Sequence, residues 1–108
     1  MTVTDRLSLL QYEHLSLGGS AAAQFTQSLD ALRVLSLAER YEHPAALYLG
    51  DIADVEDRDE LLSAKSLALG FAHGLIVAKV ISESQGEALR QVFQDAADRA
   101  LAALADPT

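Results

Sequence analysis

Residues 67–104 read LALGFAHGLIVAKVISESQGEALRQVFQDAADRALAAL, and this stretch decides the fold. Its first part is apolar around almost the whole circumference of a helix, which is typical of a helix surrounded by others. Ser82 and Gln85 then have the spacing of a capping box, in which each side chain bonds the backbone N–H of the other residue. The second part repeats apolar residues at helical spacing, on a face made of Leu89, Val92, Phe93, Ala96, Ala100, Leu101 and Leu104. We expect one helix over 57–80 and another over 83–104.

The N-terminal part of the chain carries two further helical patterns. An apolar stripe over 4–17 predicts a helix that ends at Gly18-Gly19, because glycine readily closes a helix. Alternating leucines in the same segment would also suit a strand. Ser20 is suited to cap the start of a second long helix, which we expect over 20–41.

Pro44 is expected to interrupt the helical pattern. Proline disfavours helical geometry in the residue before it and suits the first turn of a new helix. We therefore expect a break at Glu42-His43 and a short extra helix over 44–49, ended by Gly50. The predicted fold class is all-α: a compact bundle of about four helices in a single domain spanning 1–108.

Length and composition favour a domain that folds without cross-links. The chain has 108 residues, half of them hydrophobic, and no cysteine. The lack of cysteine excludes a disulfide framework, thiolate zinc sites and cysteine catalysis, and it fits the reducing cytoplasm. The first residues do not have the pattern of a signal peptide. The longest apolar run, 67–81, is shorter than the roughly 20 residues that cross a bilayer, so we expect no membrane contact.

The charge of the chain limits the classes of partner that it is expected to bind. The formal net charge is -8, and the eight lysines and arginines are scattered singly along the sequence. Binding to nucleic acid or to an anionic membrane needs clustered basic residues, so we expect neither. A strongly acidic protein prefers basic partners, or its charge serves only to keep it soluble by self-repulsion.

Residues 51–60, DIADVEDRDE, concentrate the negative charge, with six acidic residues and one basic residue. No calcium loop of the EF-hand kind starts at Asp51 or Asp54, because the required glycine and glutamate are missing from either register. Two interpretations stay open. The acidic residues stabilise the start of a helix through its dipole, or they form a docking surface for a partner protein with a basic surface. The candidate partner-binding residues are Asp51, Asp54, Glu56, Asp57, Asp59 and Glu60.

A ridge of small side chains follows in the same helical segment: Ser66, Gly70, Gly74 and Ala78, each four residues from the next. Glycine inside a helix costs about 1 kcal/mol relative to alanine, so these two glycines imply a compensating gain. Small residues allow a second helix backbone to approach closely. That second helix belongs to the same chain, or it is the same ridge on another copy in a homodimer.

Residues that could carry catalysis or bind a metal do not form a known pattern. His14, His43 and His73 are too far apart in sequence for any two to share a helix face toward one metal ion. His73 is flanked by Ala72 and Gly74 on the most apolar helix, so we expect a buried, neutral core histidine. There is neither a serine nucleophile motif nor a phosphate-binding loop. We expect no enzymatic activity, no metal and no cofactor.

One stretch resembles known proteins. It reads GFAHGLIVAKVISESQ over residues 70–85 and continues through Leu89 to residue 93. This helix–Ile-Ser–helix pattern is similar to that of small uncharacterised helical proteins of bacterial plasmids, prophages and integrative elements. The resemblance implies an accessory protein of a mobile genetic element, and it assigns a role to no residue.

The predicted function is that of a non-enzymatic protein–protein interaction module. It would regulate or inhibit a partner by docking through its acidic surface. One alternative is an acidic decoy of the anti-defence, anti-CRISPR-like kind, which occupies a nucleic-acid site on its target. Another is a helical sensor that binds a small ligand in a pocket near Tyr41, His43, Tyr48 and His73.

Overall fold

The computed structural model describes residues 19–105, which form four helices and no strand. These are α2 (Gly19–Val34), α3 (Glu39–Ala53), α4 (Arg58–Val77) and α5 (Glu83–Ala105). The predicted all-α fold class is confirmed. The helix expected over 4–17 lies outside the described residues.

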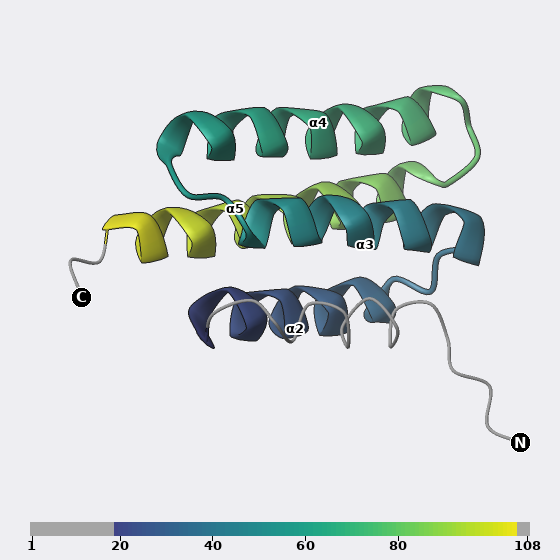
Figure 1. Cartoon of the computed structure of the whole chain (residues 1–108). Coiled ribbons are helices and arrows are strands. Elements are labelled where there is room, and N and C mark those ends of the chain that lie inside the picture. The colour runs from purple at the N-terminus through teal and green to yellow at the C-terminus, as the bar shows by residue number, and fades with distance from the viewer. Residues whose placement is uncertain (1–18, 106–108) are drawn as a thin grey trace, which may run out of the picture.

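The helices form three layers, and consecutive helices run in opposite directions (Figure 1). α3 and α5 lie side by side in the middle layer, α2 packs against both on one side, and α4 packs against both on the other. The largest buried side chains fill the space between these layers: Phe25, Leu29, Leu32, Leu49, Ile52, Leu89 and Phe93. Each helix contributes one apolar stripe to this core, as expected for a bundle.

The single helix expected over 20–41 is wrong in its second half. α2 ends at Val34, and α3 begins at Glu39 after a short connection. Ser36 in this connection has a positive φ of 54°, the left-handed conformation that closes many helices but is usually taken by glycine. The connection also places Leu37 in the core. No local pattern indicates the break, because the segment between the two helices holds neither glycine nor proline.

The break expected at Glu42-His43 is absent, and the short helix expected over 44–49 is part of α3. Pro44 lies inside this helix, where its missing N–H and its ring normally cost about 3 kcal/mol. Beyond the proline, α3 buries Ala45, Ala46, Leu49, Gly50, Ile52 and Ala53. A fully buried leucine or isoleucine contributes about 1.5–3 kcal/mol each, so tertiary packing outweighs the local preference of proline. Gly50 does not end the helix, which continues to Ala53.

The starts of α4 and α5 are confirmed. α4 begins at Arg58, next to the expected start at residue 57, and Asp57 is its N-cap. At α5, the Gln85 N–H donates to Ser82 Oγ at 3.0 Å, and the Ser82 N–H donates to Gln85 Oε1 at 3.2 Å, which completes the predicted capping box. α4 ends at Val77, earlier than the expected residue 80, because the chain turns through Lys79 at a φ of 60°.

In the part of the chain that the structure describes, α4 is not surrounded by other helices, contrary to the prediction. Its buried face consists of Leu61, Ala68, Ala72 and Leu75, which pack toward α3 and α5. On its other side, the large side chains of Leu62, Leu67 and Val77 are exposed. By length and composition α4 alone among the described helices could cross a membrane, and 28% of its most apolar window is buried in the bundle. An apolar composition all round therefore reflects an outer helix here and not a central one.

Gly86 on α5 packs closely against Ile76 on α4. It is buried, and a Cβ added there would overlap the side chain of Ile76. We expect Gly86→Val to destabilise the fold by about 2 kcal/mol, because overpacking of a packed site costs about 1–3 kcal/mol. Urea unfolding measures this loss.

Two controls accompany that measurement. Gly70→Val should change stability by less than about 0.5 kcal/mol, since an added Cβ at Gly70 meets no atom within 4 Å. Ile76→Ala in the Gly86→Val background should recover part of the lost stability, because it removes the overlapping atoms. Equal losses from Gly86→Val and Gly70→Val would contradict this description of the α4–α5 contact.

Candidate functional site

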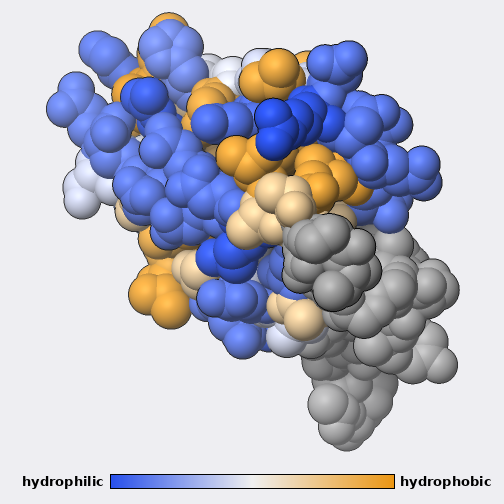
Figure 2. Space-filling model, turned by 90° about the vertical axis from the view of Figure 1, so that its left-hand side faces the viewer, coloured by the Kyte–Doolittle hydropathy of each residue, from blue (hydrophilic) through white to orange (hydrophobic). Residues whose placement is uncertain are grey.

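The acidic segment 51–60 is folded into two helix ends and their short connection. Asp51 lies in the last turn of α3, Asp54 follows that helix, and Asp59 and Glu60 lie in the first turn of α4. All six acidic side chains of the segment are exposed. The segment lies at the end of the bundle that faces the viewer in Figure 2, where mostly hydrophilic residues surround a few exposed apolar ones.

Two of the six carboxylates stabilise the start of α4. Asp57 Oδ1 accepts a hydrogen bond of 2.8 Å from the Glu60 N–H, and Glu60 Oε1 accepts one of 2.8 Å from the Glu56 N–H. This exchange satisfies backbone N–H groups that have no partner inside the helix. For Asp57 and Glu60 the helix-start interpretation of the sequence is therefore confirmed.

Asp57→Ala is expected to lower the free energy of unfolding by about 1 kcal/mol, the usual effect of removing an aspartate N-cap. Asp54→Ala is the matched control, since Asp54 is an exposed carboxylate after α3 whose side chain caps no helix. It should change stability by less than about 0.5 kcal/mol. Thermal unfolding of both variants compares them directly, and equal stability of the two would contradict the capping role.

A groove lies between the end of α3 and the start of α4, with a volume of about 490 Å³. We call it the acidic groove, and its lining residues are Asp51, Asp54, Val55, Asp59, Glu60, Ser63, Ala64 and Leu67. Four of these residues are acidic, three are apolar, and none is basic. The volume is in the range of ordinary ligand sites, and the groove is wide open to solvent on one side.

The groove offers two kinds of contact at once. Its carboxylates give a negative potential that attracts cations, while Val55, Ala64 and Leu67 offer apolar surface to a small hydrophobic side chain. Leu67 is 62% exposed, so a large part of its surface is free to be covered. A basic side chain next to an aliphatic one matches this arrangement better than either alone.

The sequence predicted the charged part of this groove and missed its apolar part. Glu60, Ala64 and Leu67 follow one another at helical spacing, so they share the side of α4 that turns toward α3. That relation could be found only once the α3 boundary was known, because α3 supplies the opposite wall. Glu56 and Asp57 do not line the groove, so the structure brings together four of the six predicted residues.

The other flank of α4 has a different character. A smaller groove of about 200 Å³ lies between α4 and α5, and its lining residues are Arg58, Leu61, Leu62, Lys65, Ala97, Asp98 and Leu101. It carries two basic residues and one acidic residue. Of the two grooves beside α4, the negatively charged one is therefore the groove on the α3 side.

The predicted small-residue ridge lies in the open. Ser66, Gly70, Gly74 and Ala78 are all exposed, and a Cβ added at either glycine meets no atom within 4 Å. The interpretation in which another helix of the same chain packs on this ridge is therefore wrong for the described residues. The reason is the position of α4 in an outer layer, which leaves this side uncovered.

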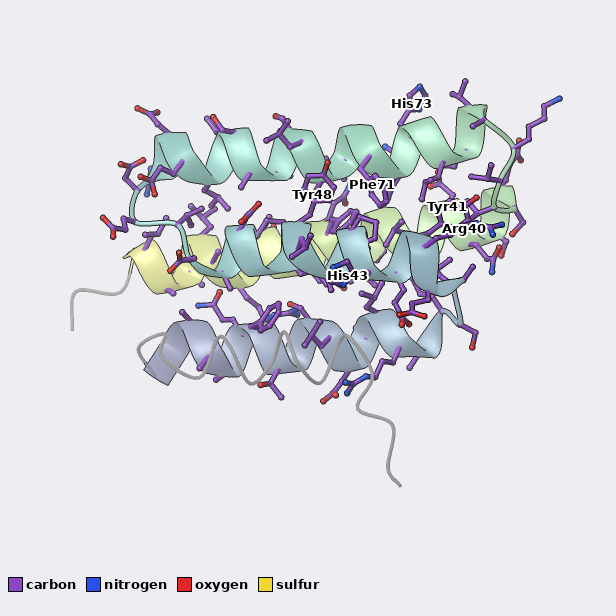
Figure 3. All side chains as sticks on the ribbon, turned by 45° about the vertical axis from the view of Figure 1, so that its right-hand side comes forward. Arg40, Tyr41, His43, Tyr48, Phe71 and His73 are labelled. Carbon is purple, nitrogen blue, oxygen red and sulfur yellow. The ribbon has the colours of Figure 1, made fainter. Side chains whose placement is uncertain are left out.

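The prediction of a buried core histidine at position 73 is also wrong. His73 is exposed and points away from the bundle, whereas His43 faces toward α2 (Figure 3). Tyr48 packs against Phe71 and Phe93, with ring centroids 5.1 and 6.4 Å apart. His73 therefore does not share a pocket with His43 and Tyr48 among the described residues.

Among the described residues 19–105, no cluster of three or more histidine, aspartate or glutamate side chains has the arrangement to hold a metal ion. The carboxylates of the acidic groove are thus a charged surface and not a preformed metal site.

Comparisons of the chain with protein-family models, with curated proteins and with solved structures gave no match.

Proposed function

We propose that this chain is a non-enzymatic docking module of the cytoplasm, which binds a basic segment of another protein in its acidic groove. The observation that carries the proposal is the composition of the groove wall: four carboxylates around three apolar residues, with no basic residue among them. The preferred segment presents lysine or arginine on both sides of an aliphatic residue. By occupying such a segment, the module would regulate or inhibit its partner.

The physical chemistry of the groove favours a reversible complex. Exposed ion pairs contribute about 0.2–1 kcal/mol each, so several pairs and one apolar contact are needed for useful affinity. The charges act more strongly on the rate of association and on the choice of partner than on the lifetime of the complex. Because exposed charges are screened by salt, binding should weaken as ionic strength rises.

The three apolar residues of the acidic groove, Val55, Ala64 and Leu67, also distinguish this function from that of an acidic decoy. A site built for nucleic acid attracts phosphates through basic groups, and a decoy replaces the phosphates by carboxylates. It has no need of the exposed Leu67 and the half-buried Val55 next to those carboxylates. The groove therefore favours a peptide-like occupant.

An accessory role in a mobile genetic element, implied by the resemblance of residues 70–93, is compatible with such an inhibitor.

Amide chemical-shift mapping by NMR tests the proposal. The probe is a short synthetic peptide in which lysines flank a leucine, called here the Lys–Leu peptide. The expected shifts are confined to residues 51–67, the two walls of the groove. Shifts spread evenly over exposed carboxylates elsewhere, such as Asp30 and Glu87, would show only non-specific attraction and would contradict the proposal.

A further inference from the structure

The outward side of α4 carries no aspartate, glutamate, lysine or arginine beyond its first turn. Its exposed residues after Glu60 are Leu62, Ser63, Ser66, Leu67, Gly70, His73, Gly74 and Val77. The side chains of Leu62 and Val77, at its two ends, are 63% and 65% exposed. None of these residues is acidic, and none is lysine or arginine. We call this surface the α4 outer face.

We infer that the α4 outer face binds a second copy of the chain, so that two α4 helices pack against each other in an antiparallel, two-fold dimer. The α4 outer face adjoins the acidic groove, and the inference does not depend on the proposed function. Of the α4 outer face, only Ser63 and Leu67 also line the groove. The groove and the dimer interface therefore lie on adjacent sides of one helix.

The two central glycines fit a close helix pair. Gly70 and Gly74 expose their backbone, since a Cβ added at either meets no atom within 4 Å. Glycine lowers helix propensity relative to alanine, and in the described part of this chain no packing contact compensates for it at either position. Two helices that cross at such positions can bring their backbones into contact, with larger residues such as Leu62 and Val77 packing on either side.

Charge favours a second copy as the occupant. The whole chain has a formal net charge of -8, so two copies repel each other at most of their surface. The α4 outer face lets them meet without bringing carboxylates together. It also gives a basic partner nothing to pair with, and it borders on the acidic start of α4, which anionic lipid would repel.

The same charges select the antiparallel arrangement. Lys79, exposed just after α4, lies nine residues beyond Gly70, and Glu60 lies ten residues before it. With 1.5 Å per residue, Glu60 is about 15 Å from Gly70 along α4, and Val77, the last residue of the helix before the turn that holds Lys79, is about 10 Å from Gly70 in the other direction. An antiparallel pair crossing at Gly70 therefore brings Lys79 of each copy to the end of the pair that carries Asp59 and Glu60 of the other. A parallel pair would place the acidic starts of both α4 helices side by side, which is unfavourable.

The expected dimer is reversible. α4 is about 30 Å long, and a contact along one helix buries less than the roughly 800 Å² per partner of a standard stable interface. We therefore expect a Kd in the micromolar range. Analytical ultracentrifugation of the intact chain over a series of concentrations measures it.

Gly70→Glu is the decisive variant. In the monomer this side chain would point into open space, so the fold is kept, but in the dimer it would place two like charges at the crossing point. We expect self-association to weaken at least tenfold. Ala102→Glu, at an exposed position of α5, adds the same charge away from the interface and should leave the Kd unchanged within about twofold.

A charge exchange tests the orientation. Lys79→Glu alone should weaken the dimer, and Lys79→Glu together with Asp59→Lys should restore it, because the pair is re-formed with opposite sign. Three outcomes would overturn the inference: a chain that stays monomeric up to about 1 mM, a dimer that Gly70→Glu leaves intact, or binding of α4 to phosphatidylcholine vesicles in place of self-association.

Discussion

Reversal of three charges in the acidic groove is expected to lower the affinity for the Lys–Leu peptide roughly 100-fold. The variant carries Asp51→Lys, Asp54→Lys and Asp59→Lys, and we call it the groove variant. Each exchange replaces an attraction of about 0.5 kcal/mol by a repulsion of similar size, so that three exchanges amount to about 3 kcal/mol. Asp57 is kept because it caps α4. Fluorescence anisotropy of a labelled peptide measures the change.

A matched control separates the groove from total charge. The control variant carries Asp30→Lys, Glu87→Lys and Asp95→Lys, all at exposed positions outside the groove. Both variants have the same net charge, so long-range attraction for the peptide falls equally in both. We expect the control variant to bind within about threefold of the unaltered chain at physiological salt, where distant charges are screened. Equal losses in the two variants would mean that the groove has no specific role.

Phe93→Ala is expected to destabilise the fold by about 3–5 kcal/mol, the usual range for removing a buried phenylalanine. The Phe93 side chain is fully buried on α5, and its ring lies 6.4 Å from that of Tyr48 on α3 in an edge-to-face arrangement. The alanine would leave a cavity between the two middle helices. In a domain of about 100 residues, such a loss lowers the Tm by about 12 °C or more.

Leu47→Ala is the comparison for that measurement. Leu47 lies on the same helix as Tyr48, but its side chain is 43% exposed and lies outside the core. We expect its loss to cost less than about 1 kcal/mol. If thermal unfolding shows the same loss for both variants, the core is not where the structure places it.

Local patterns predicted the second half of the fold well. The Ser82 capping box and the apolar stripe that includes Leu89 and Phe93 specify α5 by interactions within a few residues of one another. The same holds for Asp57 at the start of α4. Short-range hydrogen bonds and helical spacing depend on residues that are close in sequence, so these features could be predicted without knowledge of tertiary contacts.

The first half of the fold depended on contacts between distant residues. Ser36 takes a left-handed conformation that its residue type does not favour, because the connection it forms lets α2 and α3 pack together. Pro44 is tolerated inside α3 because the residues after it, such as Leu49, are buried against other helices. In both cases tertiary packing outweighed the backbone preference of the residue. The relative size of these two effects cannot be determined from a single sequence.

The two candidate surfaces were likewise predictable from the sequence only in part. The carboxylates of residues 51–60 were found from composition alone. The apolar residues of the groove, such as Leu67, could be found only from the position of α3 against α4. The small-residue ridge was identified from its spacing, but no described helix packs on it, since Gly70 and Gly74 face solvent. Periodicity identifies a distinctive helix face, whereas the arrangement of layers decides whether another helix covers it.

A reciprocal exchange of charges tests most directly whether the acidic groove recognises basic segments. The affinities of the unaltered chain and of the groove variant are measured for the Lys–Leu peptide and for a matched peptide with glutamate in place of lysine. We predict that the preference reverses: the unaltered chain binds the lysine peptide, and the groove variant binds the glutamate peptide, with the shifted NMR signals again confined to residues 51–67. A groove variant that binds neither peptide while remaining folded would contradict the account.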